Sequence, residues 1–315
     1  MSLLCHSIIK AEAIRLGFSA FGCAPAMSVD EWRRQQWESY LSEGRQADMA
    51  YLQNHLEKRL NPTLLVEGAK TVVSLAMNYY PGSDWEFGSY AFAKYAVGRD
   101  YHEVMKEKLE QLLQFIRTTA DVAVEGRAFC DTAPVDEHYW AWKCGLGWLG
   151  RNTQLTIPKQ GSYFFLGELV LNATFDHYDT PMSSKCGSCH RCIDVCPMHA
   201  LSEANGLDAR RCLSYLTIEH RGDFPKEIGL PQLGNCIYGC DRCIAVCPHN
   251  RFATLTHESD FLPRSPLLEM QREDWHALTQ EEFSKIFKGS AVKRAKHAGL
   301  MRNIEVAKQL ETADL

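Results

Sequence analysis

The sequence predicts an α+β fold built from three consecutive parts. Strand-like and helix-like segments alternate between residues 18 and 175, as in an α/β or α+β domain. Nine of the 13 cysteines then lie between residues 186 and 247. Beyond Pro263 and Pro266 the chain has helical patterns only. We therefore expect an N-terminal domain over residues 1–178, a cysteine-rich module over 179–255 and a helical C-terminal segment over 256–315.

The N-terminal part alternates the two kinds of periodicity. Residues 3–16 form an amphipathic helix pattern that Gly17 ends. Residues 71–80 form an apolar run of strand length that ends at the turn residues Pro81 and Gly82. The other predicted elements are a strand over 18–23, a helix that begins after Ser28, a helix over 103–119, a strand over 122–129, a helix over 135–144, and two strands, 155–157 and 162–171, expected to pair with each other.

Composition and charge exclude several classes of protein. A net charge of −5 argues against a uniformly basic coat that binds nucleic acid. No run of about 18 uncharged apolar residues predicts a membrane span. The first residues lack the charged start and the long apolar run of a signal peptide. Together with the many cysteines, this favours a reducing compartment and metal ligation, so we expect a cytoplasmic protein.

The cysteine spacing predicts two iron–sulfur clusters. The first run, Cys186 to Pro197, has the form C-x2-C-x2-C-x3-C-P, which is typical of bacterial ferredoxins. Three thiolates of such a run bind one [4Fe–4S] cluster, and the cysteine before proline binds the other cluster. A second, less regular run extends from Cys236 to Pro248. Zinc sites usually show two separated C-x2-C pairs instead.

Two clusters need eight thiolates, and this region offers nine. Crossed ligation assigns one cluster to Cys186, Cys189, Cys192 and Cys247. The second cluster takes Cys196, Cys240, Cys243 and one further cysteine. Either Cys212 or Cys236 can supply that ligand, and the spacing leaves the choice open.

Outside the cysteines, three groups of polar residues are candidates for function. Asp131 follows a predicted strand and precedes a predicted helix, so it is either a helix cap or a proton donor in a cleft. Tyr95, Asp100, Tyr101 and His102 form a dense polar run that is either a solvated loop or part of a site. Residues 285–302 hold six lysines and arginines and no acid, as in a solvated helix face or a phosphate-binding patch.

Several separate motifs resemble one known family, the epoxyqueuosine reductases. These enzymes are cobalamin-dependent iron–sulfur proteins that make queuosine in its last step, at the wobble position of tRNA. The resemblance covers nearly the whole chain. Its motifs are Arg59-x-x-Pro62, Tyr95-Ala-x-Gly98-x-Asp100-Tyr-His102, Asp131-Thr-Ala-Pro134, Gly147-Trp-Leu-Gly-Arg-Asn152, Gly161-Ser-x-Phe-Phe-Leu-Gly-Glu168, the two cysteine runs, Gly239-Cys-Asp241 and Ser290-Ala-x-x-Arg-Ala.

The resemblance implies a cobalamin-binding α/β domain at the N-terminus, followed by a ferredoxin-like module with two [4Fe–4S] clusters. It favours Cys212 over Cys236 as the eighth ligand and gives Asp131 the role of general acid. It also implies helical repeats at the C-terminus, of which residues 290–307 resemble the beginning; the chain ends at Leu315, where longer members continue. The residues that it assigns to the corrin are Arg59, Tyr95, Asn152, Ser162 and Asp241.

The resemblance also implies partners. We expect a tRNA anticodon stem-loop as substrate, an external low-potential electron donor of the ferredoxin or flavodoxin type, and a monomeric protein. Lys293, Arg294, Lys296 and Arg302 are expected to contact tRNA near the corrin. Two other functions remain open at this point, a reductive dehalogenase-like reductase, which uses a tyrosine as its acid, and a dicluster electron carrier.

Overall fold

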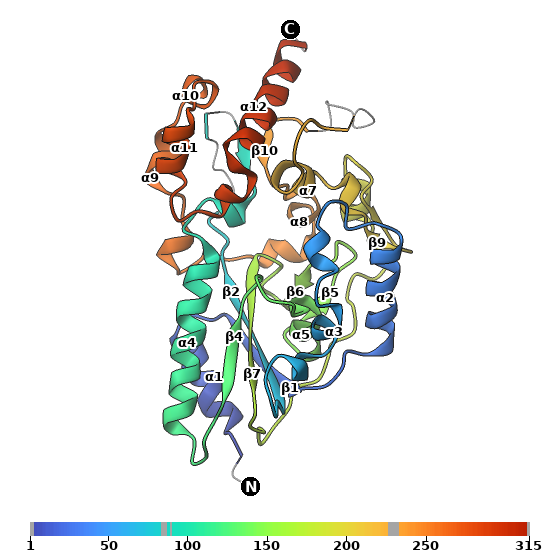
Figure 1. Cartoon of the computed structure of the whole chain (residues 1–315), viewed down its shortest axis with the longest axis vertical. Helices are drawn as coiled ribbons and strands as arrows, with labels where there is room; N and C mark the ends of the chain where they lie inside the picture. Colours follow the sequence, from blue (N-terminus) through green and yellow to red (C-terminus); the bar gives the residue numbers. More distant parts are fainter. Residues whose placement is uncertain (1–2, 83–86, 89, 226–232, 314–315) are drawn as a thin grey trace.

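A four-stranded antiparallel sheet forms the centre of the N-terminal part (Figure 1). The computed structural model describes residues 3–82, 87–88, 90–225 and 233–313. The strands lie in the order β1 (Ala20–Pro25), β2 (Thr71–Asn78), β7 (Phe164–Leu171) and β4 (Gly126–Phe129). Neighbouring strands are antiparallel throughout. The sheet and its separate helices confirm the α+β class.

Helices cover both faces of this sheet. On one face, α1 (His6–Arg15) and α4 (Tyr101–Thr119) pack against Leu75 and Leu169. On the other face, α5 (Glu137–Lys143) packs against Val72 and Val170, and α2 (Glu31–Ser42) and α3 (Leu56–Leu60) join this layer. Alternate residues of a strand point to opposite faces. The two central strands, β2 and β7, are therefore apolar and buried along almost their whole length.

The cysteine-rich module consists of short elements joined by loops. Its helices are α6 (Arg191–Asp194), α7 (Leu213–Ile218) and α8 (Arg242–Ala245), and its strands are β8 (Leu201–Ser202), β9 (Gly206–Leu207) and β10 (Cys236–Tyr238). β10 pairs in parallel with β3 (Ala91–Phe92) of the N-terminal part. This pairing ties the second cysteine run to the segment that carries the Tyr95–His102 motif.

The C-terminal helices form a layer of their own above the sheet (Figure 1). They are α9 (Ser265–Glu269), α10 (Arg272–His276), α11 (Gln280–Ile286) and α12 (Lys296–Ala313). Trp275, Phe287 and Leu300 of this layer share one apolar core with Phe92 and Tyr238. This core joins all three predicted domain ranges, and the boundaries at 178 and 255 stay a prediction.

Two of the predicted elements differ from the structure. The strand predicted over 155–157 does not pair with the one over 162–171: β6 (Leu155–Thr156) pairs with β5 (Trp148–Leu149), whereas β7 lies between β2 and β4. β4 is also shorter than predicted, because residues 122–125 precede it as a loop. Short 3₁₀ helices complete the described chain: η1 (Ala50–Leu52), η2 (Pro62–Leu64), η3 (Lys94–Ala96), η4 (Ala209–Arg211), η6 (Pro248–Phe252), η7 (Ser259–Phe261) and η8 (Ala291–Ala295).

Within the described residues, no helix has the length and apolar character needed to span a membrane.

Candidate active site and cluster-binding loops

One cavity brings the acidic motif and the second set of cysteines together. It has a volume of about 350 Å³. Asp131 and Glu137 line it from the N-terminal part, and Cys196, Cys212, Cys240 and Cys243 line it from the cysteine-rich module. Residues more than 100 positions apart in the sequence therefore meet at a single site.

Asp131 enters this cavity from the loop after β4. Its backbone is left-handed, with φ of 55°, a conformation that Asp tolerates better than most residues. The backbone N–H of Asp131 donates to the Glu137 carboxylate, which holds the loop in this conformation. The Asp131 side chain accepts hydrogen bonds from the Tyr101 hydroxyl and from His102 Nε2, the latter at 3.1 Å.

His102 joins two carboxylates. Its Nδ1 lies 2.6 Å from Asp100 and its Nε2 lies 3.1 Å from Asp131. Burial lowers the pKa of His102, but the hydrogen bonds and charges of Asp100 and Asp131 outweigh this effect and raise that pKa to about 9. His102 is therefore an imidazolium at neutral pH, and it carries a proton directly beside Asp131.

The surroundings of Asp131 distinguish between its two interpretations, a helix cap and a proton donor. The carboxylate is not buried, because its side chain is 55% exposed. Desolvation raises the pKa of Asp131, but the hydrogen bonds from His102 and Tyr101 outweigh it, so this pKa lies below its usual value. Asp131 is also not the helix cap: Asp136 caps α5 by accepting the Tyr139 N–H. The Asp131 side chain therefore faces the cavity, where it accepts the hydrogen bonds from Tyr101 and His102.

Asp136 fixes the first turn of α5. Its buried carboxylate receives two hydrogen bonds from Arg33, at 2.6 and 2.8 Å, and one from Trp37 Nε1 at 2.6 Å. These bonds satisfy a charge that would otherwise be costly to bury. Glu137, the next residue, is held in turn at the base of the Asp131 loop.

Glu137 and Glu168 form a second acidic group behind Asp131. Burial and the charge of Asp131 raise the pKa of Glu137 to about 8. Glu168 is fully buried in β7, where Ser74 donates to it at 3.0 Å, and burial together with Glu137 raises its pKa well above the usual value. Neither residue has a role in the predictions made from the sequence. The signal that could have marked Glu168 is a glutamate within an apolar strand.

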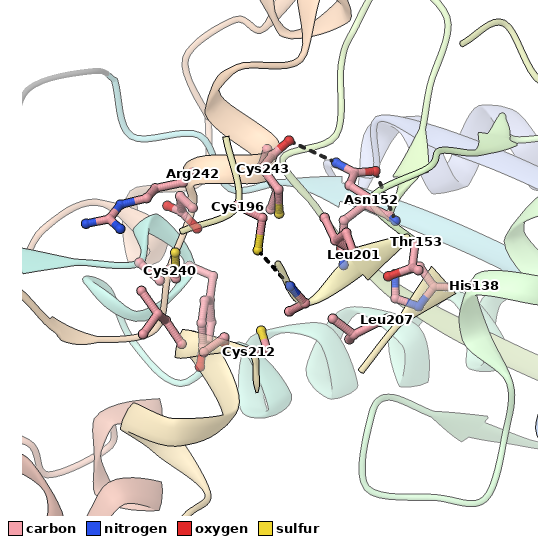
Figure 2. A pocket seen from close by; sticks show the side chains of 18 of the residues that line it. His138, Asn152, Thr153, Cys196, Leu201, Leu207, Cys212, Cys240, Arg242 and Cys243 are labelled. Atoms are coloured by element: carbon pink, nitrogen blue, oxygen red, sulfur yellow. Dashed lines mark hydrogen bonds between the residues drawn. The ribbon is translucent and has the colours of Figure 1, made fainter. Parts of the chain in front are cut away.

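The four thiols proposed for the second cluster face one another. Figure 2 shows Cys196, Cys212, Cys240 and Cys243 with their sulfur atoms directed into a common space. Burial raises the pKa of the Cys243 thiol, and the nearby thiols of Cys212, Cys240 and Cys196 raise it further. Asn152 Nδ2 donates to the Cys243 carbonyl at 3.2 Å, which holds this loop against the N-terminal part.

The other four cysteines form a separate group. Burial raises the pKa of Cys247, and the thiols of Cys186 and Cys189 contribute to the same shift. Burial likewise raises the pKa of Cys192, whose thiol is near those of Cys186 and Cys247. The last cysteine of each run therefore lies with cysteines of the other run: Cys247 lies near Cys186, Cys189 and Cys192, and Cys196 lies near Cys240 and Cys243. This is the crossed arrangement expected for two [4Fe–4S] clusters.

Cys236 lies apart from both groups. Its thiol is buried and donates to the Gly239 carbonyl at 2.7 Å. It does not line the cavity, whereas Cys212 does. This geometry favours Cys212 as the ligand, as the family resemblance implies.

The spacing of the thiols is wider than zinc requires. Ligands of one tetrahedral zinc ion, each about 2.3 Å from the metal, approach one another to about 4 Å. In the described part of the chain, one group of three His, Cys, Asp or Glu ligand atoms lies within 4.8 Å of one another: His6, Cys23 and Asp179, outside the cysteine-rich module. The cluster cysteines are further apart, as is expected when each thiolate binds a different iron atom of a cubane.

The residues predicted to contact the corrin fall into two sets. Tyr95, Asn152 and Asp241 line the cavity. Arg59 and Ser162 are not among its lining residues. Arg59 lies over the Trp37 ring, and Ser162 lies 3.2 Å from the Thr156 hydroxyl, so both have partners within the protein.

The four basic residues predicted to contact tRNA differ in their exposure and in their partners within the protein. Lys293 and Lys296 are exposed, and Arg294 forms a two-point ion pair with Glu219, at 2.7 and 2.8 Å. Arg302 is half-buried and donates to the carbonyls of Leu216, His220 and Gly222. Those bonds hold its guanidinium against the chain, and the contact of Arg302 with tRNA stays a prediction.

Matches to known proteins cover both parts of this site. Residues 59–132 match the family described as "Epoxyqueuosine reductase QueG, DUF1730", and residues 185–250 match a "4Fe-4S double cluster binding domain". The epoxyqueuosine reductase of Cellulophaga algicola is 44% identical over 306 residues, which cover 96% of this chain and 98% of the relative. The chain belongs to the epoxyqueuosine reductase family.

Solved structures of epoxyqueuosine reductases share its fold. One, with an epoxyqueuosine-modified tRNA-Tyr stem loop, has a TM-score of 0.88 and 28% identity, and the match covers 96% of this chain and 80% of that chain. Another, from Bacillus subtilis, has its catalytic aspartate loop swung out of the active site; its TM-score is 0.87 at 27% identity, with 96% and 81% of the two chains covered.

The cofactors of an epoxyqueuosine reductase are two [4Fe–4S] clusters and cobalamin, and the cavities fit the latter. Aromatic side chains, among them Tyr95 and Phe165, offer flat apolar surface, and Asn152 and Gln154 offer amides for the polar rim of a corrin. A larger cavity of about 1020 Å³ adjoins the first and shares His138, Thr153, Gln154 and Leu207 with it. Together they provide room for a corrin and for its nucleotide tail.

Proposed function

We propose that this oxidoreductase converts epoxyqueuosine to queuosine at the wobble position of tRNA, with Asp131 and His102 as its proton-donating pair. The reaction removes the epoxide oxygen as water and leaves a carbon–carbon double bond, so it consumes two electrons and two protons. One observation carries the proposal: a single cavity has a carboxylate–imidazolium pair on one side and four cluster thiols on the other. Protons and electrons therefore reach one place from opposite sides.

Bound cobalamin supplies a strongly reducing cobalt centre for breaking the carbon–oxygen bond. The protein holds the proton. His102 is protonated at neutral pH and donates to Asp131, and Asp131 is the exposed member that reaches the substrate oxygen. The His102 proton passes to the Asp131 carboxylate, and Asp131 passes it on to the departing oxygen, which leaves His102 neutral. Glu137, with a pKa of about 8, holds a second proton beside the same loop.

The tyrosines of the site are poor acids. Burial and the charge of Asp131 raise the pKa of Tyr101 well above its usual value, and burial and Tyr238 do the same for Tyr95. A reductive dehalogenase that uses a tyrosine as its acid is therefore a weaker interpretation. A plain dicluster electron carrier would have no need for a carboxylate–imidazolium pair opposite its cluster thiols.

The substrate proposed is the anticodon stem-loop of a tRNA. The solved reductase with a modified tRNA stem loop supports this proposal, because its fold matches 96% of this chain. We also propose that the protein acts as a monomer in the cytoplasm, where it meets a low-potential electron donor of the ferredoxin or flavodoxin type.

Substitution of Asp131 tests the proposal. Asp131→Asn and Asp131→Ser remove the acid but keep a small polar side chain that suits this loop. We expect both variants to keep their clusters, cobalamin and tRNA affinity, and to lose about a hundredfold or more of epoxide reduction. The measurement is single-turnover conversion of epoxyqueuosine tRNA by enzyme reduced with dithionite. Turnover of Asp131→Asn at a near wild-type rate would exclude Asp131 as the donor.

A further inference from the structure

A third cavity, of about 520 Å³, lies beside Cys247 on the first-cluster side of the module. Its lining includes Lys94, Arg191 and Arg251 and no acidic residue. It shares no lining residue with the cavity that contains Asp131. A partner bound here would therefore lie next to a thiol of the Cys186–Cys247 group without entering the substrate site.

The surface around this cavity is basic with an apolar centre. Arg191 and Arg251 are exposed, and within the described residues neither has an ion-pair partner. The Arg251 guanidinium lies over the Phe252 ring, 4.6 Å from its centroid, and Phe252 is itself 38% exposed. Ala245, on the rim, is exposed as well. We name these four residues the basic face.

We propose that the basic face is the docking site for an acidic one-electron carrier of the flavodoxin or ferredoxin type. This inference rests on the proposed function, which needs an external source of electrons. The chain as a whole has a net charge of −5, so a local basic surface orients an acidic partner that would otherwise be repelled. Electron-transfer encounters bury small interfaces, below about 1,200 Å², and a face of this size is sufficient for one.

The electron count sets how often this face is used. Each encounter oxidises one reduced carrier by one electron. Two encounters supply the electron pair that, with two protons, converts one epoxide to an alkene and water. The carrier must therefore leave quickly after each transfer, and binding dominated by charge at a partly exposed surface suits rapid exchange.

Charge reversal tests the proposal on the holoenzyme. We compare the wild type with Arg191→Glu/Arg251→Glu, using an acidic flavodoxin as the probe. We expect the double variant to bind flavodoxin about tenfold more weakly at low salt and to lose most of the salt dependence of binding. The rate at which reduced flavodoxin reduces the clusters, measured as the loss of their visible absorbance, should fall by a similar factor. The rate of reduction by dithionite should equal that of the wild type.

A matched control variant has the same overall charge as the Arg191→Glu/Arg251→Glu variant. Lys10→Glu/Lys106→Glu places the same two reversals on exposed positions of α1 and α4 and should bind flavodoxin as the wild type does. Equal flavodoxin affinity in the wild type and the Arg191/Arg251 variant would overturn the proposal. A loss of tRNA affinity without a loss of flavodoxin affinity would overturn it in favour of a nucleic-acid surface. If the double reversal lowers iron content, Arg251→Gln alone must still weaken flavodoxin binding.

Dithionite separates this proposal from the proposed function. Dithionite-driven turnover of epoxyqueuosine tRNA in the Arg191/Arg251 variant is expected to match that of the wild type. If the wild type does not convert epoxyqueuosine tRNA with dithionite, the proposed function is wrong. The affinity for flavodoxin tests the proposed docking site independently of that result.

Discussion

At the scale of single residues, the proton donor that we propose is a pair of side chains and not one acid. The exposed carboxylate of Asp131 carries a pKa below its usual value, so alone it has no proton to give at neutral pH. His102, clamped between Asp100 and Asp131, keeps its proton up to about pH 9. The motif of Asp100, Tyr101 and His102, which as a sequence could be a solvated loop, is therefore part of the proton donor that we propose.

The pair makes a prediction about pH. The pKa of folded His102 lies at about 9, above its ordinary value of 6.5, so the proton is present through the neutral range and is lost as the pH rises through about 9. We expect turnover to be level around neutral pH and to fall above about pH 9. His102→Gln should lower turnover by about 10²–10⁴-fold and abolish this alkaline decline.

The pH profile of dithionite-driven single turnover measures both effects. Cobalamin and iron content, determined on the same samples, show whether the variant is intact. An unchanged alkaline decline in His102→Gln would mean that another group, with Glu137 as the nearest candidate, supplies the proton.

At the scale of elements, the loops that carry the cysteines follow from local spacing, but their eighth ligand does not. The C-x2-C-x2-C run specifies which cysteines lie on one loop, because the chain is continuous there. Cys212 comes from the start of α7 and Cys236 from β10, and only the packing of α7 against the second loop brings Cys212 to the cavity. Spacing along the sequence carries no information about this contact.

The two cysteines therefore predict opposite outcomes. Cys212→Ala should lose or damage one cluster, because a cubane with three thiolates has an open iron. Cys236→Ala should keep about eight iron atoms per chain, the total for two cubanes, because its thiol donates only to the Gly239 carbonyl. Iron analysis and electron paramagnetic resonance of the reduced proteins measure this. Cluster loss in Cys236→Ala with intact clusters in Cys212→Ala would reverse the assignment.

The strands show the same limit of local patterns. The existence of β1, β2 and β7 was predictable, because apolar runs of strand length are flanked by turn residues. The strand that pairs with β7 was not predictable. Residues 155–157 are its nearest neighbour in sequence, yet β7 pairs with β2, about 90 residues away. Burial on both faces of β7 removes the alternation that would have indicated how it packs.

At the scale of the whole molecule, the predicted three parts share their interiors. Phe92 from the N-terminal range, Tyr238 from the module and Trp275 from the C-terminal helices belong to one core. The parallel pairing of β3 with β10 adds backbone contacts between the first two. The cavity that contains Asp131 is therefore framed by elements that are tied together on more than one side. The periodicity of the sequence indicated the helices and strands of each part. It did not indicate the contacts between the parts, because these depend on pairs of residues far apart in sequence.

The C-terminal basic residues illustrate why charge alone is a weak signal. Arg302 donates to three backbone carbonyls of the segment 216–222 and lies over Phe224. Its role is to hold α12 against the module. Arg294 is paired with Glu219 and lies over the Tyr51 ring, close enough to Asp131 for their charges to interact. Lys293 and Lys296, on either side of Arg294 in the sequence, are exposed as well.

The last prediction concerns these two lysines. If they contact tRNA phosphates near the active site, Lys293→Ala/Lys296→Ala should weaken tRNA binding and reduce the slope of log affinity against log salt by about one for each lost contact. Arg302→Ala should act differently: it removes charge-assisted hydrogen bonds to partly exposed carbonyls, each contributing about 1.5–3 kcal/mol at most to folding stability. Binding titrations at several salt concentrations and thermal unfolding separate the two effects. An unchanged affinity and slope in the double lysine variant would show that these lysines form only a solvated face.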